Sequence, residues 1–198
     1  MKTKKWASLM TVLFVFTFLG TTQAAVYNFT PTDPDLGDLV HQNYYRWGIN
    51  WSIPASESLL SASLFFDNIQ NWDASANVLY AHLLLSAPVG LVTFFDNEGG
   101  GDNFFGQGIL LNQWNNLPTT PQDITYNFDN SELSTLVSYL TDDNFGIGLD
   151  PDCHYYNDGI RLTLTTDPVP EPATMLLFGT GLVGLAGLGK KKLLKKGI

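Results

Sequence analysis

Residues 159–166 read Gly-Ile-Arg-Leu-Thr-Leu-Thr-Thr, and this stretch decides the fold class. Every second residue from Ile160 to Leu164 is apolar, and the residues between them are polar. Successive side chains of a β-strand point to opposite faces, so a period of two is typical of a strand with one buried face. We therefore predict a half-buried β-strand at this position.

The same kind of pattern recurs upstream. Residues 60–66 alternate in the same way and predict a second half-buried strand. Residues 78–85 are apolar on both faces, which favours a central strand that is covered on both sides. Further candidates are short strands at 91–95, 109–111, 124–128 and 145–149, and an aromatic stretch at 38–53 that predicts one or two strands broken near Gly48.

One predicted helix, over residues 131–141, interrupts this series of strands. Asp129 and Glu132 have the spacing of a capping pair at its start. Its apolar residues recur at helical spacing: Leu133, Leu136, Val137 and Leu140. Many short strands joined by polar turns, with one short helix, predict a mostly β fold, namely a β-sandwich of jelly-roll or immunoglobulin-like type.

The first 24 residues have the composition of a signal peptide. Lysines near the N-terminus precede a short apolar stretch at 6–20, and small residues up to Ala24 complete the pattern that a signal peptidase cleaves. We predict cleavage after Ala24, with a retained N-terminal anchor as the alternative. Residues 25–168 then form the body, which at about 145 residues has the usual size of a single domain.

The C-terminal segment, residues 169–198, has three parts. Val169, Pro170, Glu171 and Pro172 lead into an apolar run at 173–189, which is about long enough to cross a bilayer as a helix. The lysines beyond this transmembrane helix place the tail in the cytoplasm and the body outside. A plain tail anchor, with the prolines serving as a rigid linker, is the alternative.

Taken together, Pro170-Glu171-Pro172, the glycine-rich apolar run and the lysine tail resemble the PEP-CTERM sorting signal. The resemblance implies an exported protein whose anchor is removed near these prolines by an exosortase, a membrane-embedded cysteine transpeptidase or protease. It also implies an inner-membrane-anchored intermediate and a final place at the cell surface or in the extracellular matrix, in bacteria that make exopolysaccharide and biofilm. The signal indicates how the protein is sorted and not what the body does.

Charge is divided sharply along the chain. Between Ala25 and Val169 there are two basic residues, Arg46 and Arg161, against eighteen acidic ones, which is a formal charge of −16. A body this acidic cannot neutralise phosphates, so we exclude nucleic acid as a partner.

Cys153 is the only cysteine, so no intrachain disulfide forms. His154 beside it predicts a solvent-side histidine next to a buried cysteine, because adjacent strand residues point to opposite faces.

The acidic residues cluster in predicted turns, and oxygen-rich loops are typical of calcium sites. Their spacing is not that of an EF-hand. Aspartate and asparagine are also common in turns for backbone reasons, so plain turn chemistry is the alternative. The candidate calcium ligands are Asp67, Asp73, Asp96, Asp102, Asp150, Asp152 and Asp158.

Two tryptophans, Trp72 and Trp114, lie beside polar loop residues, and we predict that they are exposed and bind carbohydrate by stacking on sugar rings. The alternative is that they are core or edge aromatics of the sheets.

We expect the body to be a non-catalytic envelope or matrix protein, a calcium-supported polysaccharide-binding or adhesive module. A secreted enzyme that acts on matrix polysaccharide is the alternative, although the chain carries no G-x-S-x-G or H-E-x-x-H motif.

Overall fold

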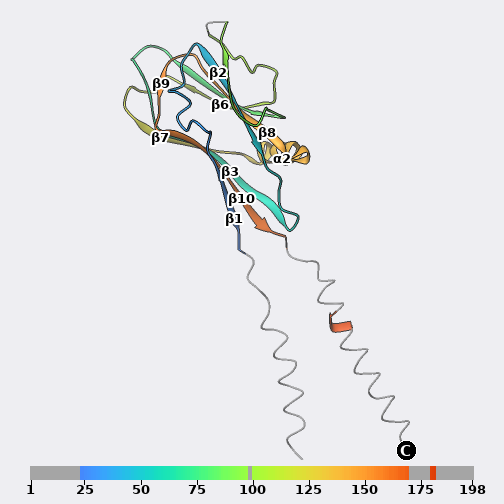
Figure 1. Cartoon of the computed structure of the whole chain (residues 1–198). Coiled ribbons are helices and arrows are strands. Elements are labelled where there is room, and N and C mark those ends of the chain that lie inside the picture. Colours follow the sequence, from blue (N-terminus) through green and yellow to red (C-terminus); the bar gives the residue numbers. More distant parts are fainter. Residues whose placement is uncertain (1–22, 98–99, 170–178, 182–198) are drawn as a thin grey trace, which may run out of the picture.

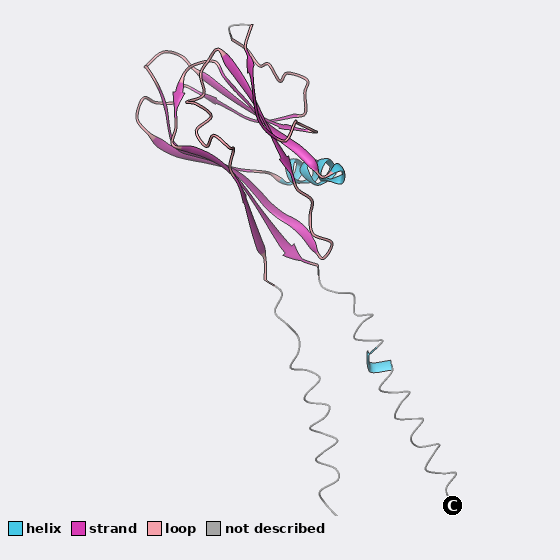
Figure 2. Ribbon diagram, in the orientation of Figure 1, coloured by secondary structure: helices cyan, strands magenta, loops and turns pink. Residues whose placement is uncertain are grey.

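The computed structural model of the chain describes residues 23–97, 100–169 and 179–181. Strands dominate the body and form two five-stranded antiparallel sheets (Figures 1 and 2). The first sheet has the order β1 (Ala25–Phe29), β10 (Gly159–Pro168), β3 (Glu57–Asn71) and β7 (Gln122–Asn127), with β9 (Tyr155–Tyr156) paired to the end of β3. The second sheet has the order β5 (Gly90–Phe95), β2 (Asn43–Asn50), β8 (Asn144–Pro151), β4 (Val78–Leu84) and β6 (Ile109–Asn115).

The two sheets enclose one hydrophobic core. Leu162 of β10 lies opposite Leu64 of β3 in the first sheet, and neither side chain is exposed to solvent. Leu83 of β4 lies opposite Ile147 of β8 in the second sheet and joins the same cluster of buried residues. Burying each such side chain contributes about 1.5–3 kcal/mol. The prediction of a mostly β fold is therefore confirmed, and the choice between a jelly-roll and an immunoglobulin-like type stays a prediction.

The helix begins as predicted. In α2 (Asn130–Tyr139), the Asp129 carboxylate accepts from the backbone N–H of Glu132, and the Glu132 carboxylate accepts from the N–H of Asp129. This reciprocal capping box satisfies backbone donors that the first helical turn leaves free. A short 3-10 turn, η2 (Leu140–Asp142), ends the helical segment.

The expected strand break near Gly48 is wrong. β2 runs without interruption from Asn43 to Asn50 and contains Gly48. A Cβ atom at Gly48 would lie 2.0 Å from the backbone oxygen of Pro88, so glycine here lets a neighbouring segment cross close to the sheet. Gly48 also forms a bridge with Val89. The residue marks a close approach of two backbones and not the end of a strand.

Both connections to the predicted targeting segments leave the body at the same end. Ala25, the first residue of β1, lies opposite Thr166 near the end of β10. Figure 1 shows this end at the bottom of the view, with the loops that follow β3, β5, β6 and β8 at the top. The loop end of the body therefore points away from the residues through which the sorting segment is attached.

Candidate functional site

An aromatic cluster lies at the loop end of the body. Trp72, which directly follows β3, is 57% exposed, and Tyr156 of β9 is 41% exposed. The His154 ring lies between them, with ring centroids 6.2 Å from Trp72 and 4.9 Å from Tyr156. The Trp72 and His154 rings are stacked with an angle of 26° between their planes. We call Trp72, His154 and Tyr156 the aromatic platform.

Strand pairing fixes the position of the platform. Asn71 and Tyr155 lie opposite each other where β3 pairs with β9, and both are buried. Because side chains alternate along a strand, their neighbours Trp72 and Tyr156 point outward. The backbone N–H of Trp72 also donates to the backbone oxygen of His154 at 3.0 Å. The platform is therefore held by main-chain bonds rather than by its own ring contacts alone.

The prediction that Trp114 is exposed is wrong, whereas Trp72 is exposed as predicted. Trp114 in β6 is half-buried and packs against the core. Its ring centroid lies 5.3 Å from that of Phe66 and 6.1 Å from that of Tyr126. Both partners are far from Trp114 in sequence, so its polar neighbours were a poor guide. The structure brings His154 and Tyr156, and not Trp114, to Trp72.

The predicted calcium ligands fall into three separate places. Asp73 stands alone and accepts hydrogen bonds from the backbone and hydroxyl of Ser75, which hold the pKa of its carboxyl below the usual range. Asp67 and Asp158 lie together: the backbone N–H of Asp158 donates to the backbone oxygen of Asp67 at 2.9 Å. These two line a shallow hollow of about 170 Å³ with Arg161. The remaining four candidates lie in or near the loop that follows β5: Asp96, Asp102, Asp150 and Asp152.

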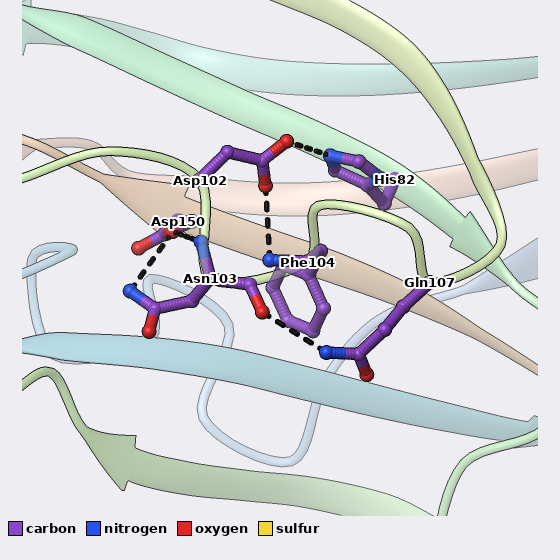
Figure 3. Close-up of polar contacts among 6 residues, drawn as sticks. All are labelled: His82, Asp102, Asn103, Phe104, Gln107 and Asp150. Carbon is purple, nitrogen blue, oxygen red and sulfur yellow. Dashed lines mark hydrogen bonds and ion pairs between the residues drawn. The ribbon is translucent and has the colours of Figure 1, made fainter. Parts of the chain in front are cut away.

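That loop, residues 100–108, packs on the face of the second sheet that is turned away from the core. Carboxylates fasten it there, and Figure 3 shows those of Asp102 and Asp150. The backbone N–H and side-chain amide of Asn103 donate to Oδ2 of Asp150 at 2.6 and 3.2 Å. The backbone N–H of Gly101 donates to Asp152 at 3.0 Å. Nε2 of His82 lies 3.0 Å from Oδ2 of Asp102. Asp96 is close enough to raise the pKa values of Asp150 and Asp152.

Phe104 seats the same loop on the sheet. It is fully buried, and a Cβ atom at Gly148 would lie 2.9 Å from its ring. His82 and Tyr44 flank the ring, with centroids 5.6 and 5.4 Å away. The Arg46 guanidinium lies 5.6 Å from its centroid. The outer face of the second sheet is thus covered at its centre by a packed loop.

Asp150 is the most perturbed carboxyl group of this cluster. Its side chain is completely buried, and burial raises its pKa to about 6. The hydrogen bonds from Asn103 oppose this shift, while the charges of Asp152 and Asp96 add to it. Oδ1 of Asp150 has no hydrogen-bond partner in the described part of the chain. The folded state therefore holds an ionised carboxylate at neutral pH in a place that disfavours the charge.

This arrangement predicts how stability depends on pH. Because the pKa of Asp150 is raised on folding, its contribution to stability is greatest below pH 4 and is lost as the pH rises through about 6. We expect Asp150→Asn to abolish this destabilisation at pH 7.5, so that the variant is more stable than wild type there by on the order of 2 kcal/mol. Urea unfolding of both proteins between pH 4 and pH 7.5 measures the difference. The exposed Asp142→Asn serves as control, and parallel curves for wild type and Asp150→Asn would refute the prediction.

Calcium binding stays a prediction. Among residues 23–97, 100–169 and 179–181, no three carboxylate, histidine or cysteine side chains converge closely enough to hold a metal ion. Asp96, Asp102, Asp150 and Asp152 lie near one another. The carboxylates of Asp102, Asp150 and Asp152 accept hydrogen bonds from backbone N–H groups, and Asp102 also pairs with His82.

Comparison with known proteins identifies the C-terminal segment. Residues 168–192 match the family described as the PEP-CTERM protein-sorting motif. The chain carries a PEP-CTERM sorting signal. This confirms the resemblance inferred from Pro170-Glu171-Pro172 and supports export and processing by an exosortase through a membrane-anchored intermediate. A search of the curated proteins finds no match.

The PEP-CTERM signal begins where the folded body ends. Pro168 is the last residue of β10 and the first residue of the match. Val169 is still tied to the body, because its backbone N–H donates to the Ser56 oxygen at 2.8 Å. Pro170, Glu171 and Pro172 lie outside the described residues, as do residues 1–22 of the predicted signal peptide. No helix in the described part of the chain is long and apolar enough to span a membrane, and most of the predicted span is outside that part.

Proposed function

We propose that the body is a non-catalytic polysaccharide-binding module of the cell envelope or extracellular matrix, delivered there by its PEP-CTERM signal. The aromatic platform is the observation that supports this proposal. Pyranose rings have an apolar C–H face that packs on aromatic rings, and large aromatic side chains carry much of the energy at binding surfaces. A solvent-exposed Trp72 stacked on His154 and next to Tyr156 offers such a surface.

The charge of the body favours a neutral polysaccharide. Residues 25–169 carry a formal charge of −16, with Arg46 and Arg161 as the only basic residues. An acidic sugar chain would be repelled by this field, whereas an uncharged one would not. Arg46 and Arg161 are also placed over the phenylalanine rings of Phe94 and Phe65. We therefore expect neutral sugars to be bound in preference to uronic acid polymers.

The position of the perturbed carboxyl group favours binding over hydrolysis. A glycosidase needs a carboxylic acid with a raised pKa that faces substrate in a cleft, opposite a second carboxylate. Asp150 has the raised pKa, but it is completely buried beneath the 100–108 loop. A secreted enzyme is therefore the weaker of the two proposals.

A pull-down tests the binding proposal. The mature body, residues 25–168, is mixed with insoluble cellulose, chitin, β-1,3-glucan and the purified matrix polysaccharide of the host, and bound protein is measured. We expect retention by at least one neutral polysaccharide and release by its soluble oligosaccharides. Retention by none of the four would overturn the proposal.

The final location of the protein is a separate part of the proposal. We expect the protein recovered from the cell surface or matrix of its host to begin at Ala25 and to end near Pro172. Intact-mass spectrometry of membrane, surface and medium fractions measures both ends. A full C-terminus ending at Ile198, found in membranes alone, would contradict release from the anchor.

A further inference from the structure

A second polar site begins one residue beyond the aromatic platform. A pocket of about 280 Å³ lies between the turn that follows Trp72 and the turn that follows β6. Its polar lining consists of Asp73, Ser75, Asn77, Asn116 and Thr119. We propose that this pocket is a subsite that binds the hydroxyl groups of the sugar residue next to the one stacked on the platform. The inference rests on the proposed function, and it implies that the site contacts at least two adjacent sugar residues.

The pocket is preformed, because hydrogen bonds within the protein hold the two turns that line it. Asn77 is 4% exposed and joins its two turns: Oδ1 accepts from the backbone N–H of Leu117 at 2.8 Å, and the amide donates to the oxygens of Leu117 and Ser75 at 3.2 and 3.1 Å. The backbone N–H of Asn71 donates to the Pro118 oxygen at 2.8 Å. A preformed site loses little conformational entropy on binding, which favours affinity.

The same buried amide connects the pocket with the platform. The hydroxyl of Tyr155 donates to Oδ1 of Asn77 at 3.0 Å, and Tyr155 lies between His154 and Tyr156 in sequence. Trp72 and Asp73 are consecutive residues, so their Cα atoms are about 3.8 Å apart. The Tyr155 side chain points to the face opposite the platform, so this bond ties the pocket to the strand that carries Tyr156. The adjacency of Trp72 and Asp73 lets a chain of sugar residues reach both the stacking surface and the pocket.

The pocket lining has the chemistry that sugar hydroxyls require. The pKa of Asp73 is lowered by the Ser75 hydrogen bonds, so its carboxylate is ionised at neutral pH and accepts hydrogen bonds. Those bonds go to Oδ1 of Asp73. The side-chain amide of Asn116 and the hydroxyl of Thr119 belong to the same polar lining. A carboxylate with an amide and a hydroxyl offers both acceptors and donors, and it disfavours an anionic sugar.

Three substitutions remove these groups while keeping the turns. Asp73→Asn keeps the oxygen that accepts from Ser75. Asn116→Gly suits a backbone with φ of 56°, a region that glycine adopts readily. Thr119→Val replaces a hydroxyl by a methyl group of the same shape. Thermal unfolding and circular dichroism establish that each variant is folded before binding is measured.

The test measures affinity as a function of chain length. The polysaccharide retained in the pull-down is hydrolysed, and its oligomers of two to six residues are titrated by calorimetry. We expect wild-type affinity to rise with length and the triple variant to lose at least fivefold in affinity for the hexamer. If the oligomers bind in a Trp72-dependent way but the triple variant matches wild type at every length, the subsite inference is overturned and the proposed function stands. If no oligomer binds, both are overturned.

Discussion

Trp72→Ala is expected to lower the affinity of the body for its retained polysaccharide at least tenfold, which is about 1.4 kcal/mol. The reason is that Trp72 supplies the largest exposed ring of the platform. Its removal also leaves the His154 ring without its stacking partner. Adding Tyr156→Ala is expected to abolish retention in the pull-down. Depletion assays on the polysaccharide measure the affinity of each variant.

A matched control separates the platform from general surface hydrophobicity. Phe105 is 87% exposed and lies on the 100–108 loop, outside the aromatic platform. Phe105→Ala is expected to leave retention unchanged. Equal losses in Phe105→Ala and Trp72→Ala would mean that binding is non-specific, and an unchanged Trp72→Ala would mean that the platform is not the contact surface.

Phe104→Ala is expected to have the largest effect on stability. Replacing a fully buried phenylalanine by alanine typically costs about 3–5 kcal/mol. Here the lost ring also fixes the 100–108 loop to the outer face of the second sheet, against Gly148, His82 and Tyr44. Urea unfolding measures the free energy, and limited proteolysis measures how easily the loop is cut.

Gly148 provides a double-mutant cycle for the same contact. A Cβ atom at Gly148 would lie 2.9 Å from the Phe104 ring, so Gly148→Ala is expected to destabilise the wild type by about 1–3 kcal/mol. In the Phe104→Ala background the obstructing ring is gone, and the same substitution is expected to cost little. Additive losses would show that Phe104 is not seated on Gly148.

Patterns local in sequence could be predicted, and contacts between distant segments could not. β10 and β3 were predicted because a buried face leaves a period of two in the sequence. β1 and β9 were missed. Each is short, and each is defined by its partner strand: Ala25 pairs with Thr166, and Tyr156 pairs with Gln70. Two to five residues carry too little periodicity to indicate a strand.

The candidate site shows the same limit. The same cue, polar residues that follow in the sequence, placed Trp72 correctly at the surface and Trp114 wrongly. The platform needed the β3–β9 pairing, which places His154 and Tyr156 beside Trp72, and no local pattern contains that information. The grouping of the acidic residues was equally non-local: Asp150 lies in β8, and the structure brings it to Asn103 of the 100–108 loop, next to Asp102.

Tryptophan signals in solution test the central claim most directly. The mature body contains Trp47, Trp51, Trp72 and Trp114, each with one indole N–H. Trp47 is 3% exposed and serves as an internal control. In ¹H–¹⁵N spectra, with Trp72 assigned by a Trp72→Phe variant, we expect the retained oligosaccharide to shift the Trp72 indole signal and to leave that of Trp47 in place. An unmoved Trp72 signal at saturating oligosaccharide would contradict the proposal that this face of the body binds sugar.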